Sequence, residues 1–149
     1  MVTKILVATD GSKAAVKAVR YAADLARQTG AGIILLSVVD RNSVITGSIP
    51  AFSTPTHIAE SVEDYMRHAA EAYLSAAEKL CVKKGVETKT VTRAGHPVGE
   101  ILKEARRSKA DLIVMGSHGK SALESAVLGS VTYGVIHNDT KIPVLVTRT

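Results

Sequence analysis

The chain contains very little cysteine. Cys81 is the single cysteine among 149 residues, so no disulfide can form within the chain. The opening residues, Met1 to Leu6, lack the apolar stretch of a secretory signal. We therefore expect a cytoplasmic protein whose stability comes from its core.

Long hydrophobic runs are missing as well. Stretches such as Gly32–Leu36 have the length of a β-strand, far below the roughly 20 residues that a helix needs to cross a bilayer. The sequence thus predicts no membrane span.

Aromatic side chains make up only 3% of the residues, and tryptophan is absent. The net charge of +5 would favour a nucleic-acid partner if the basic residues were clustered. They are instead spread over the predicted helices, and few rings are available to stack on bases. We interpret the charge as solvated helix faces and expect no nucleic-acid binding.

What the chain has in quantity is small and branched apolar residues. The hydrophobic fraction is 46%, and a chain of 149 residues can bury a substantial core without metal or disulfide. Such a composition is typical of a buried parallel sheet covered by helices. We predict a single domain over residues 1–149.

Predicted strands and helices alternate along the chain. The strands are Lys4–Ala8, Gly32–Val39, Glu87–Thr92, Asp111–Met115 and Pro143–Thr147. The helices are 13–29, 58–84, Pro97 to about Ser108, and Ser130 to about Asn138. Ser12 is the expected N-cap of the first helix, and Gly30 and Gly85 are expected to end the first two. This alternation predicts an α/β fold, an open doubly wound parallel sheet with helices on both faces.

Residues 41–57 form the one long segment without clear periodicity. Two interpretations stay open for it: a lid that covers a bound base, and a disordered loop.

Three glycines follow the fourth predicted strand at Gly-x2-Gly-x9-Gly-Ser spacing: Gly116, Gly119 and Gly129, with Ser130 next. Glycine can take positive φ and lets a ligand approach the backbone, and amides at the start of a following helix can bind an anion. Ser130 would add a hydroxyl at the cap of that helix. The spacing indicates a phosphate-binding loop.

The same segment has two other interpretations. Gly119-Lys120-Ser121 matches the last three residues of a Walker loop. Such a loop also needs glycine at position 114, which is Val114 in this chain. Alternatively the glycines only shape turns, with Gly129 as the left-handed residue closing a short helix from Ser121 to Leu128.

In these motifs the chain resembles the universal stress proteins, in their nucleotide-binding branch. The matching segments are Val7–Asp10, Leu36–Asp40, Gly95–Pro97, Ala110–Gly119, Gly129–Val131 and Pro143–Val146. The resemblance implies a five-stranded sheet in the order 3-2-1-4-5, of the adenine-nucleotide α-hydrolase-like type, and a symmetric homodimer joined along the last strand. Ala8 departs from a proline found in some relatives.

The resemblance also implies one ATP for each subunit. Residues carried over as nucleotide-binding are Thr9, Asp10, Val38, Met115, Gly116, Ser117, His118, Gly119, Lys120, Gly129, Ser130 and Val131. Thr9 and Asp10 would lie near the ribose and base, and Val38 would offer its backbone to adenine. With the order 3-2-1-4-5, the first and fourth strands would bring Thr9–Gly11 and Gly116–Gly119 to one crevice.

Asp10 indicates whether a metal ion accompanies the nucleotide. A carboxylate repels a triphosphate unless it faces the ribose or shares a divalent metal with the phosphates, so Mg²⁺ is expected with ATP. The alternative for Asp10 is a turn residue in Asp-Gly-Ser. The histidines have no metal-ligand spacing, and Cys81 has no activating neighbour.

No catalytic set accompanies the predicted loop, although hydrolysis needs a positioned water and an orienting group. We therefore predict an ATP-binding protein of the stress response that acts as a nucleotide-dependent regulatory switch, at most a weak ATPase. The alternatives are an adenine-nucleotide enzyme, such as an ATPase or nucleotidyl transferase, and a dimeric scaffold that binds no nucleotide.

Overall fold

The fold comes from a computed structural model, which describes residues 1–40, 55–119, 128–138 and 141–148, and for residues 55–61 the backbone alone. The strands are β1 (Lys4–Ala8), β2 (Gly32–Asp40), β3 (Thr88–Gly95), β4 (Leu112–Gly116) and β5 (Val144–Thr147). The helices are α1 (Lys13–Thr29), α3 (Pro55–Lys83), α4 (Pro97–Ser108) and α5 (Ser130–His137).

The five strands form one parallel sheet in the order β3-β2-β1-β4-β5. This confirms the predicted fold class and strand order. The chain winds outward from β1 to one edge and then returns to fill the other, so strand order reverses between β1 and β4. The ends of these two strands, Ala8 and Gly116, therefore lie at the topological switch point.

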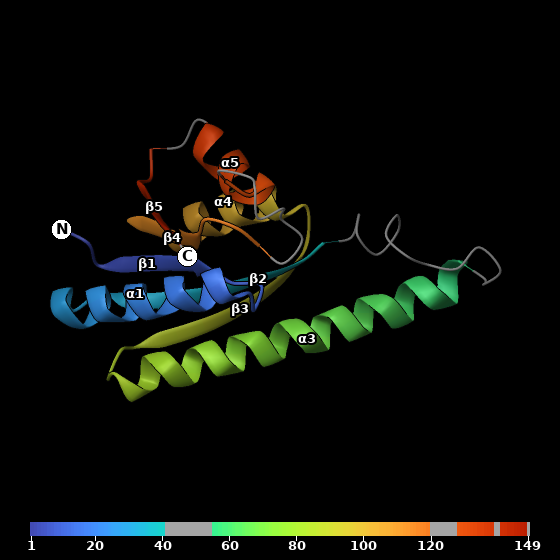
Figure 1. Cartoon of the computed structure of the whole chain (residues 1–149), viewed down its shortest axis with the longest axis horizontal. Coiled ribbons are helices and arrows are strands. Elements are labelled where there is room, and N and C mark those ends of the chain that lie inside the picture. Colours follow the sequence, from blue (N-terminus) through green and yellow to red (C-terminus); the bar gives the residue numbers. More distant parts are fainter. Residues whose placement is uncertain (41–54, 120–127, 139–140, 149) are drawn as a thin grey trace.

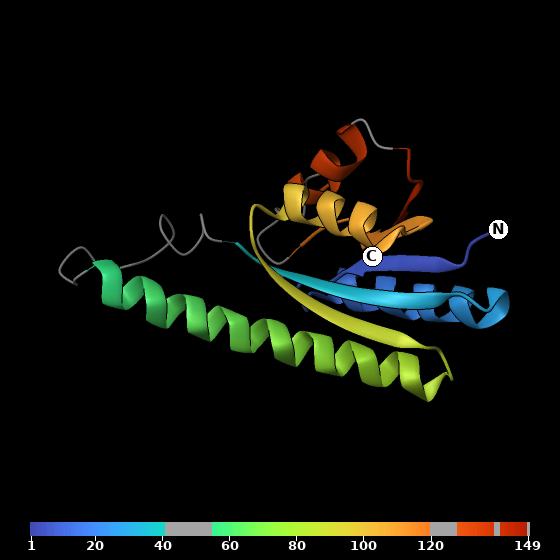
Figure 2. The same ribbon diagram turned by 180° about the vertical axis from the view of Figure 1, so that it is seen from behind.

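Helices cover both faces of the sheet, with α1 and α3 on one face and α4 and α5 on the other (Figures 1 and 2). Strand residues alternate between the two layers because successive side chains point to opposite faces. Ile5 and Val7 join the core beneath α1 and α3. Leu6 joins the core beneath α4 and α5. Both layers are rich in aliphatic side chains, as the composition predicted.

The local signals for α1 are confirmed. The Ser12 hydroxyl accepts a hydrogen bond from the Ala15 amide, and Gly30 ends the helix in the left-handed conformation with φ 78°. Its inward face is lined with alanines, which let the helix lie close to the sheet. This close approach positions the β1–α1 turn at the switch point.

The third strand and the second helix differ slightly from the sequence prediction. β3 runs to Gly95 instead of Thr92, and α3 begins at Pro55 instead of residue 58. α3 extends well beyond the sheet at its N-terminal end (Figure 1). Among the described helices, none combines the length and the apolar composition that a membrane span requires.

Candidate functional site

A cavity of about 350 Å³ lies at the carboxyl ends of β1 and β4. Its lining brings together ten of the residues that the sequence predicted: Thr9, Asp10, Val38, Met115, Gly116, His118, Gly119, Gly129, Ser130 and Val131. They come from four separate parts of the chain. Ser117 is the exception among the described residues, and Lys120 lies outside the part of the chain that the structure describes.

Space restricts side chains at the three glycines, most strictly at Gly116. A Cβ at Gly116 would lie 2.7 Å from the carbonyl carbon of Ala14, and one at Gly119 would lie 2.7 Å from Oδ2 of Asp10. At Gly129 the nearest atoms, Cα of His118 and the carbonyl oxygen of Ser117, would be 3.3 Å away. The backbone of this loop is therefore packed against α1, against Asp10 and against itself.

This geometry corrects two expectations. None of the three glycines has positive φ; the left-handed glycines of the described residues lie elsewhere, as at Gly11. Gly129, with φ −68°, is the N-cap of α5, and Ser130 is the first helical residue instead of the cap. A φ of −68° also rules out Gly129 as a left-handed residue that closes a preceding helix.

The N-terminus of α5 opens into the cavity. Ser130, Val131 and Thr132 all line it. No described residue accepts a hydrogen bond from their three backbone amides, because the first bond of this helix runs from the Tyr133 amide to the Gly129 carbonyl. Free amides at a helix start, with the positive end of the helix dipole, are suited to an anion.

Two hydrogen bonds hold this helix start in place. Thr132 is 4% exposed, and its hydroxyl donates to the Gly116 carbonyl at 2.8 Å. The Gly129 amide donates to the Ser117 carbonyl at 2.7 Å. Both bonds tie the beginning of α5 to the end of β4, so the free amides have a fixed direction.

The turn after β1 forms the opposite wall. The Ser12 amide donates to Oδ1 of Asp10 at 2.9 Å, and the Gly11 amide donates to the Thr9 hydroxyl at 3.3 Å. The first bond forms an Asx turn at Asp10 and the second an ST turn at Thr9, so Asp10 has the turn role that was the alternative to a cofactor role. Because Oδ2 of Asp10 also faces Gly119, the carboxylate lies between the two loops at the crevice.

Ser117 has a supporting position. The residue is 3% exposed, and its Oγ lies 3.0 Å from Nδ1 of His118. Its amide donates to the carbonyl of Thr147 on the edge strand β5. Ser117 therefore fixes the loop and the ring of His118, while His118 itself lines the cavity.

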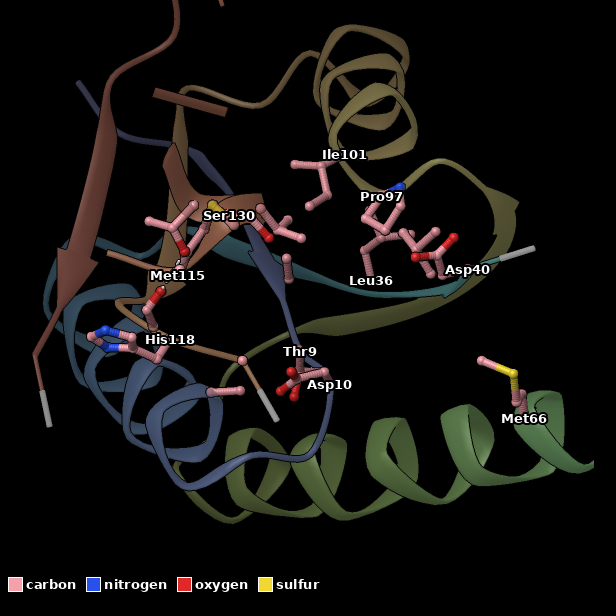
Figure 3. Close-up of a pocket in the computed structure, with 18 residues that line it drawn as sticks. Thr9, Asp10, Leu36, Asp40, Met66, Pro97, Ile101, Met115, His118 and Ser130 are labelled. Atoms are coloured by element: carbon pink, nitrogen blue, oxygen red, sulfur yellow. Dashed lines mark hydrogen bonds between the residues drawn. The ribbon is translucent and has the colours of Figure 1, made fainter. Parts of the chain in front are cut away.

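The cavity has chemically different ends. His118 and Ser130 lie on one side, and Asp40 and Pro97 on the other, with Thr9 and Asp10 below (Figure 3). The end near Asp40 is walled by apolar side chains, among them Leu36 and Ile101. A ligand with an anionic group and a flat apolar group would match both ends.

Sequence reasoning missed several of the lining residues. They are Ala8, Ala15, Leu36, Asp40, Met66, Pro97, Ile101 and Thr132. The two-residue period of a strand was a usable signal for Leu36 and Asp40, which share a face with Val38. Nothing in the sequence could signal Met66, because its place depends on how far α3 extends beyond the sheet.

A metal site or a reactive thiol would be a different kind of functional site in the described residues. Within these residues, no group of three His, Cys, Asp or Glu side chains could hold a metal ion. Burial raises the pKa of the Cys81 thiol, in agreement with an inert structural cysteine.

The predicted lid at 41–57 falls largely on residues outside the description, as does most of the alternative helix from Ser121 to Leu128.

Fold and site together define an α/β protein with an open doubly wound sheet and a glycine-walled cavity at its switch point. The family model for the universal stress protein family matches residues 1–148, and the chain belongs to this family.

Individual relatives resemble the chain over its whole length. Universal stress protein YxiE of Bacillus subtilis is 34% identical over 149 residues, which cover 99% of this chain and 100% of the relative. The solved structure of MJ0577, a universal stress protein of Methanocaldococcus jannaschii, has a TM-score of 0.87 at 30% identity and covers 100% of this chain and 97% of that chain.

A third relative is a universal stress protein solved in complex with cAMP. It has a TM-score of 0.70 at 25% identity, and the match covers 99% of this chain and 98% of that chain. An adenine nucleotide is therefore a ligand of at least one protein with this fold.

Proposed function

We propose that this chain binds ATP, or a closely related adenine nucleotide, in the switch-point cavity and acts as a nucleotide-dependent regulatory protein of the stress response. The observation that carries the proposal is the set of three amides, from Ser130 to Thr132, that have no acceptor among the described residues and line the cavity. A phosphate at the start of α5 would accept hydrogen bonds from them and meet the positive end of the helix dipole.

The shape of the cavity supports a nucleotide over a simple phosphate. Its volume of about 350 Å³ is within the range of small-molecule sites, about 300–1,000 Å³. The phosphates would lie near Gly119 and Ser130, and the base would lie toward Leu36 and Val38. Val38 would then present its backbone to adenine, as proposed from the family resemblance. The relative in complex with cAMP supports an adenine base.

Magnesium fits this arrangement with a single protein carboxylate. Mg²⁺ is usually bound through one or two carboxylates together with substrate phosphates. Asp10 is the carboxylate that lies between the β1–α1 turn and Gly119. Asp10 would hold the ion beside the phosphates, and the ion would offset their charge. Its Oδ1 is already fixed by the Ser12 amide, so the carboxylate is oriented before a ligand arrives.

We propose that the site binds its nucleotide and does not turn it over rapidly. Phosphoryl transfer needs an oriented nucleophile and stabilisation of the transferred group. The bond between Ser117 Oγ and Nδ1 of His118 anchors the histidine ring to the loop. We propose that the bound nucleotide sets the conformation of the loops around the cavity, and that hydrolysis is slow.

The proposal is tested on purified protein with no added ligand. The protein is denatured, any released nucleotide is identified by chromatography and mass, and stripped protein is titrated with ATP and GTP by calorimetry, with Mg²⁺ or with EDTA. We expect about one adenine nucleotide per chain or an ATP Kd near the micromolar range, about 8 kcal/mol of binding free energy. The absence of both released nucleotide and ATP binding would leave the dimeric scaffold as the better account.

A further inference from the structure

A second cavity, of about 340 Å³, lies on the other side of the β1–α1 turn, between α1 and α3. Its lining residues are Thr9, Gly11, Val16, Val19, Ala72, Tyr73, Ala76, Ala77 and Leu80. The space is a groove and not an enclosed void, because several of its lining residues are exposed or only partly buried. Its size is within the range of sites that hold a small molecule.

The side chains indicate what kind of occupant fits. Most of the lining is aliphatic, and on the α3 side alanines leave the space that larger residues would fill. An apolar lining favours apolar molecules over water, because apolar surface is then removed from solvent. Ala72 and Ala76 are exposed, so the cavity opens to solvent beside them and a ligand has a route in.

The Thr9 hydroxyl in the wall adds a requirement. Thr9 is 6% exposed, and its hydroxyl accepts a bond from the Gly11 amide at 3.3 Å. No described residue accepts a bond from the Thr9 hydroxyl proton. A buried donor without an acceptor is costly, so a ligand that carries one neutral oxygen would be favoured over a pure hydrocarbon.

The second cavity shares its wall with the candidate nucleotide site. Thr9 lines both cavities, while the neighbours Asp10 and Gly11 line one each. The Tyr73 ring of α3 lies against Gly11, with Cδ1 only 2.4 Å from where a Cβ would be, and Gly11 has φ 77°. A molecule that moves the Tyr73 ring would therefore act directly on the turn that carries Asp10.

We propose that the α1–α3 cavity is a second ligand site, for a neutral and largely aliphatic molecule of about ten non-hydrogen atoms with one oxygen. Its occupancy alters the affinity of the first cavity through Tyr73 and Gly11. The site itself is independent of the proposed function, whereas the coupling rests on it.

The first test uses nucleotide-free protein with 1-octanol as the probe. Methyl NMR signals of Val16, Val19 and Leu80 should shift together and saturate at about one molecule per chain. Ala76→Leu, which places a larger side chain in the cavity, should weaken octanol binding at least about tenfold, in line with the loss of a well-shaped apolar site. Ser75→Leu adds a similar side chain to the same turn of α3 outside the cavity and should bind octanol like the wild type.

Val16→Phe fills the cavity from the α1 side. It replaces Ala76→Leu in this test if that variant does not fold. Non-saturating shifts, shifts at other methyl groups, or equal octanol binding by the filled variants would overturn the site.

The second test measures the coupling. ATP is titrated into the protein with and without saturating octanol, and the reciprocal titration is done with octanol. Because coupling between two sites is reciprocal, both affinities should change by the same factor, expected to be about fivefold or more. The Ala76→Leu variant should show no octanol effect on ATP binding.

The outcomes of the two tests are distinguishable. Octanol binding together with an unchanged ATP affinity would overturn the coupling. A protein that binds octanol but no ATP would contradict the proposed function and leave the α1–α3 ligand site supported.

Discussion

At the residue scale, the glycines of the candidate site are explained by their neighbours. Gly116 ends β4 directly against the backbone of Ala14 on α1, and Gly119 faces the Asp10 carboxylate. The first neighbour is main chain and cannot yield, whereas the second is the end of a side chain and can. Substitutions at the two glycines should therefore have different effects.

Gly116→Ala should lower the free energy of unfolding by about 1–3 kcal/mol, the usual cost of adding a methyl group to a well-packed contact. The measurement is urea denaturation followed by circular dichroism. Gly99→Ala is the matched control, because a Cβ at Gly99 in α4 meets nothing within 4 Å. That substitution should stabilise by about 0.5–1 kcal/mol, since alanine favours helix over glycine. Equal effects of the two variants would contradict the contact with Ala14.

Ser130→Ala should weaken ATP binding by roughly 1.5–3 kcal/mol, the range for a hydrogen bond to a charged group. Calorimetric titration measures this change. Ile136→Ala on the same helix is the control, because Ile136 is 46% exposed and does not line the cavity. An unchanged ATP affinity of Ser130→Ala would refute the proposed hydroxyl contact, while the three backbone amides of α5 would remain available.

At the element scale, β1 and β4 are tied together at the end of the sheet away from the cavity. The Asp111 carboxylate accepts hydrogen bonds from the amides of Thr3 and Lys4 and from the Thr3 hydroxyl, each at 2.8 Å. These bonds, first that from the Thr3 hydroxyl, lower the pKa of Asp111. The tie fixes the register of the two strands whose other ends form the candidate site.

The lowered pKa makes a prediction about pH. A carboxyl whose pKa is lower in the folded state than in the unfolded state contributes stability above its unfolded value, about 3.9, and loses it as pH falls through the folded value. Asp111→Asn should therefore be less stable than the wild type at pH 5–7, and the difference should shrink below about pH 4. Urea midpoints across this range test it. A difference that is constant down to pH 2 would contradict the role of the ionised carboxylate.

Local signals explain which elements the sequence could predict. α1 is bounded by Ser12 and Gly30, whose cap and left-handed roles depend on neighbouring residues alone, and its limits were predicted as observed. α3 begins at Pro55, which follows Thr54 in the sequence, and proline at the first helical position after a threonine is a usable start signal. The prediction of residue 58 overlooked this signal. Gly129 was missed as the N-cap of α5, because serine is the commoner cap residue. Glycine suits the position because it fits the narrow space beside His118.

At the scale of the whole molecule, the sheet order was predicted with the help of the family resemblance, because pattern alone does not order strands. Once the order is known, Asp10 and Gly119 must meet at the switch point. The α1–α3 cavity had no sequence signal, since it depends on how two helices far apart in the chain pack together.

The edge strand β5 leads to a prediction about assembly. Val146 is half-buried and belongs to neither core cluster of the described residues. Exposed apolar sheet edges are generally paired or covered. We therefore propose a symmetric homodimer joined along β5, and Val146→Lys should shift it toward monomer. Sedimentation at micromolar concentration measures the mass, and a wild-type monomer under these conditions would contradict the proposal.

The most direct test of the central claim is an amide NMR titration of the nucleotide-free protein with ATP and Mg²⁺. The account predicts that the largest shifts fall on the amides of Ser130, Val131 and Thr132, with further shifts at Gly119 and Asp10. Binding that leaves these amides unchanged, or no binding at all, would contradict a nucleotide site at the start of α5.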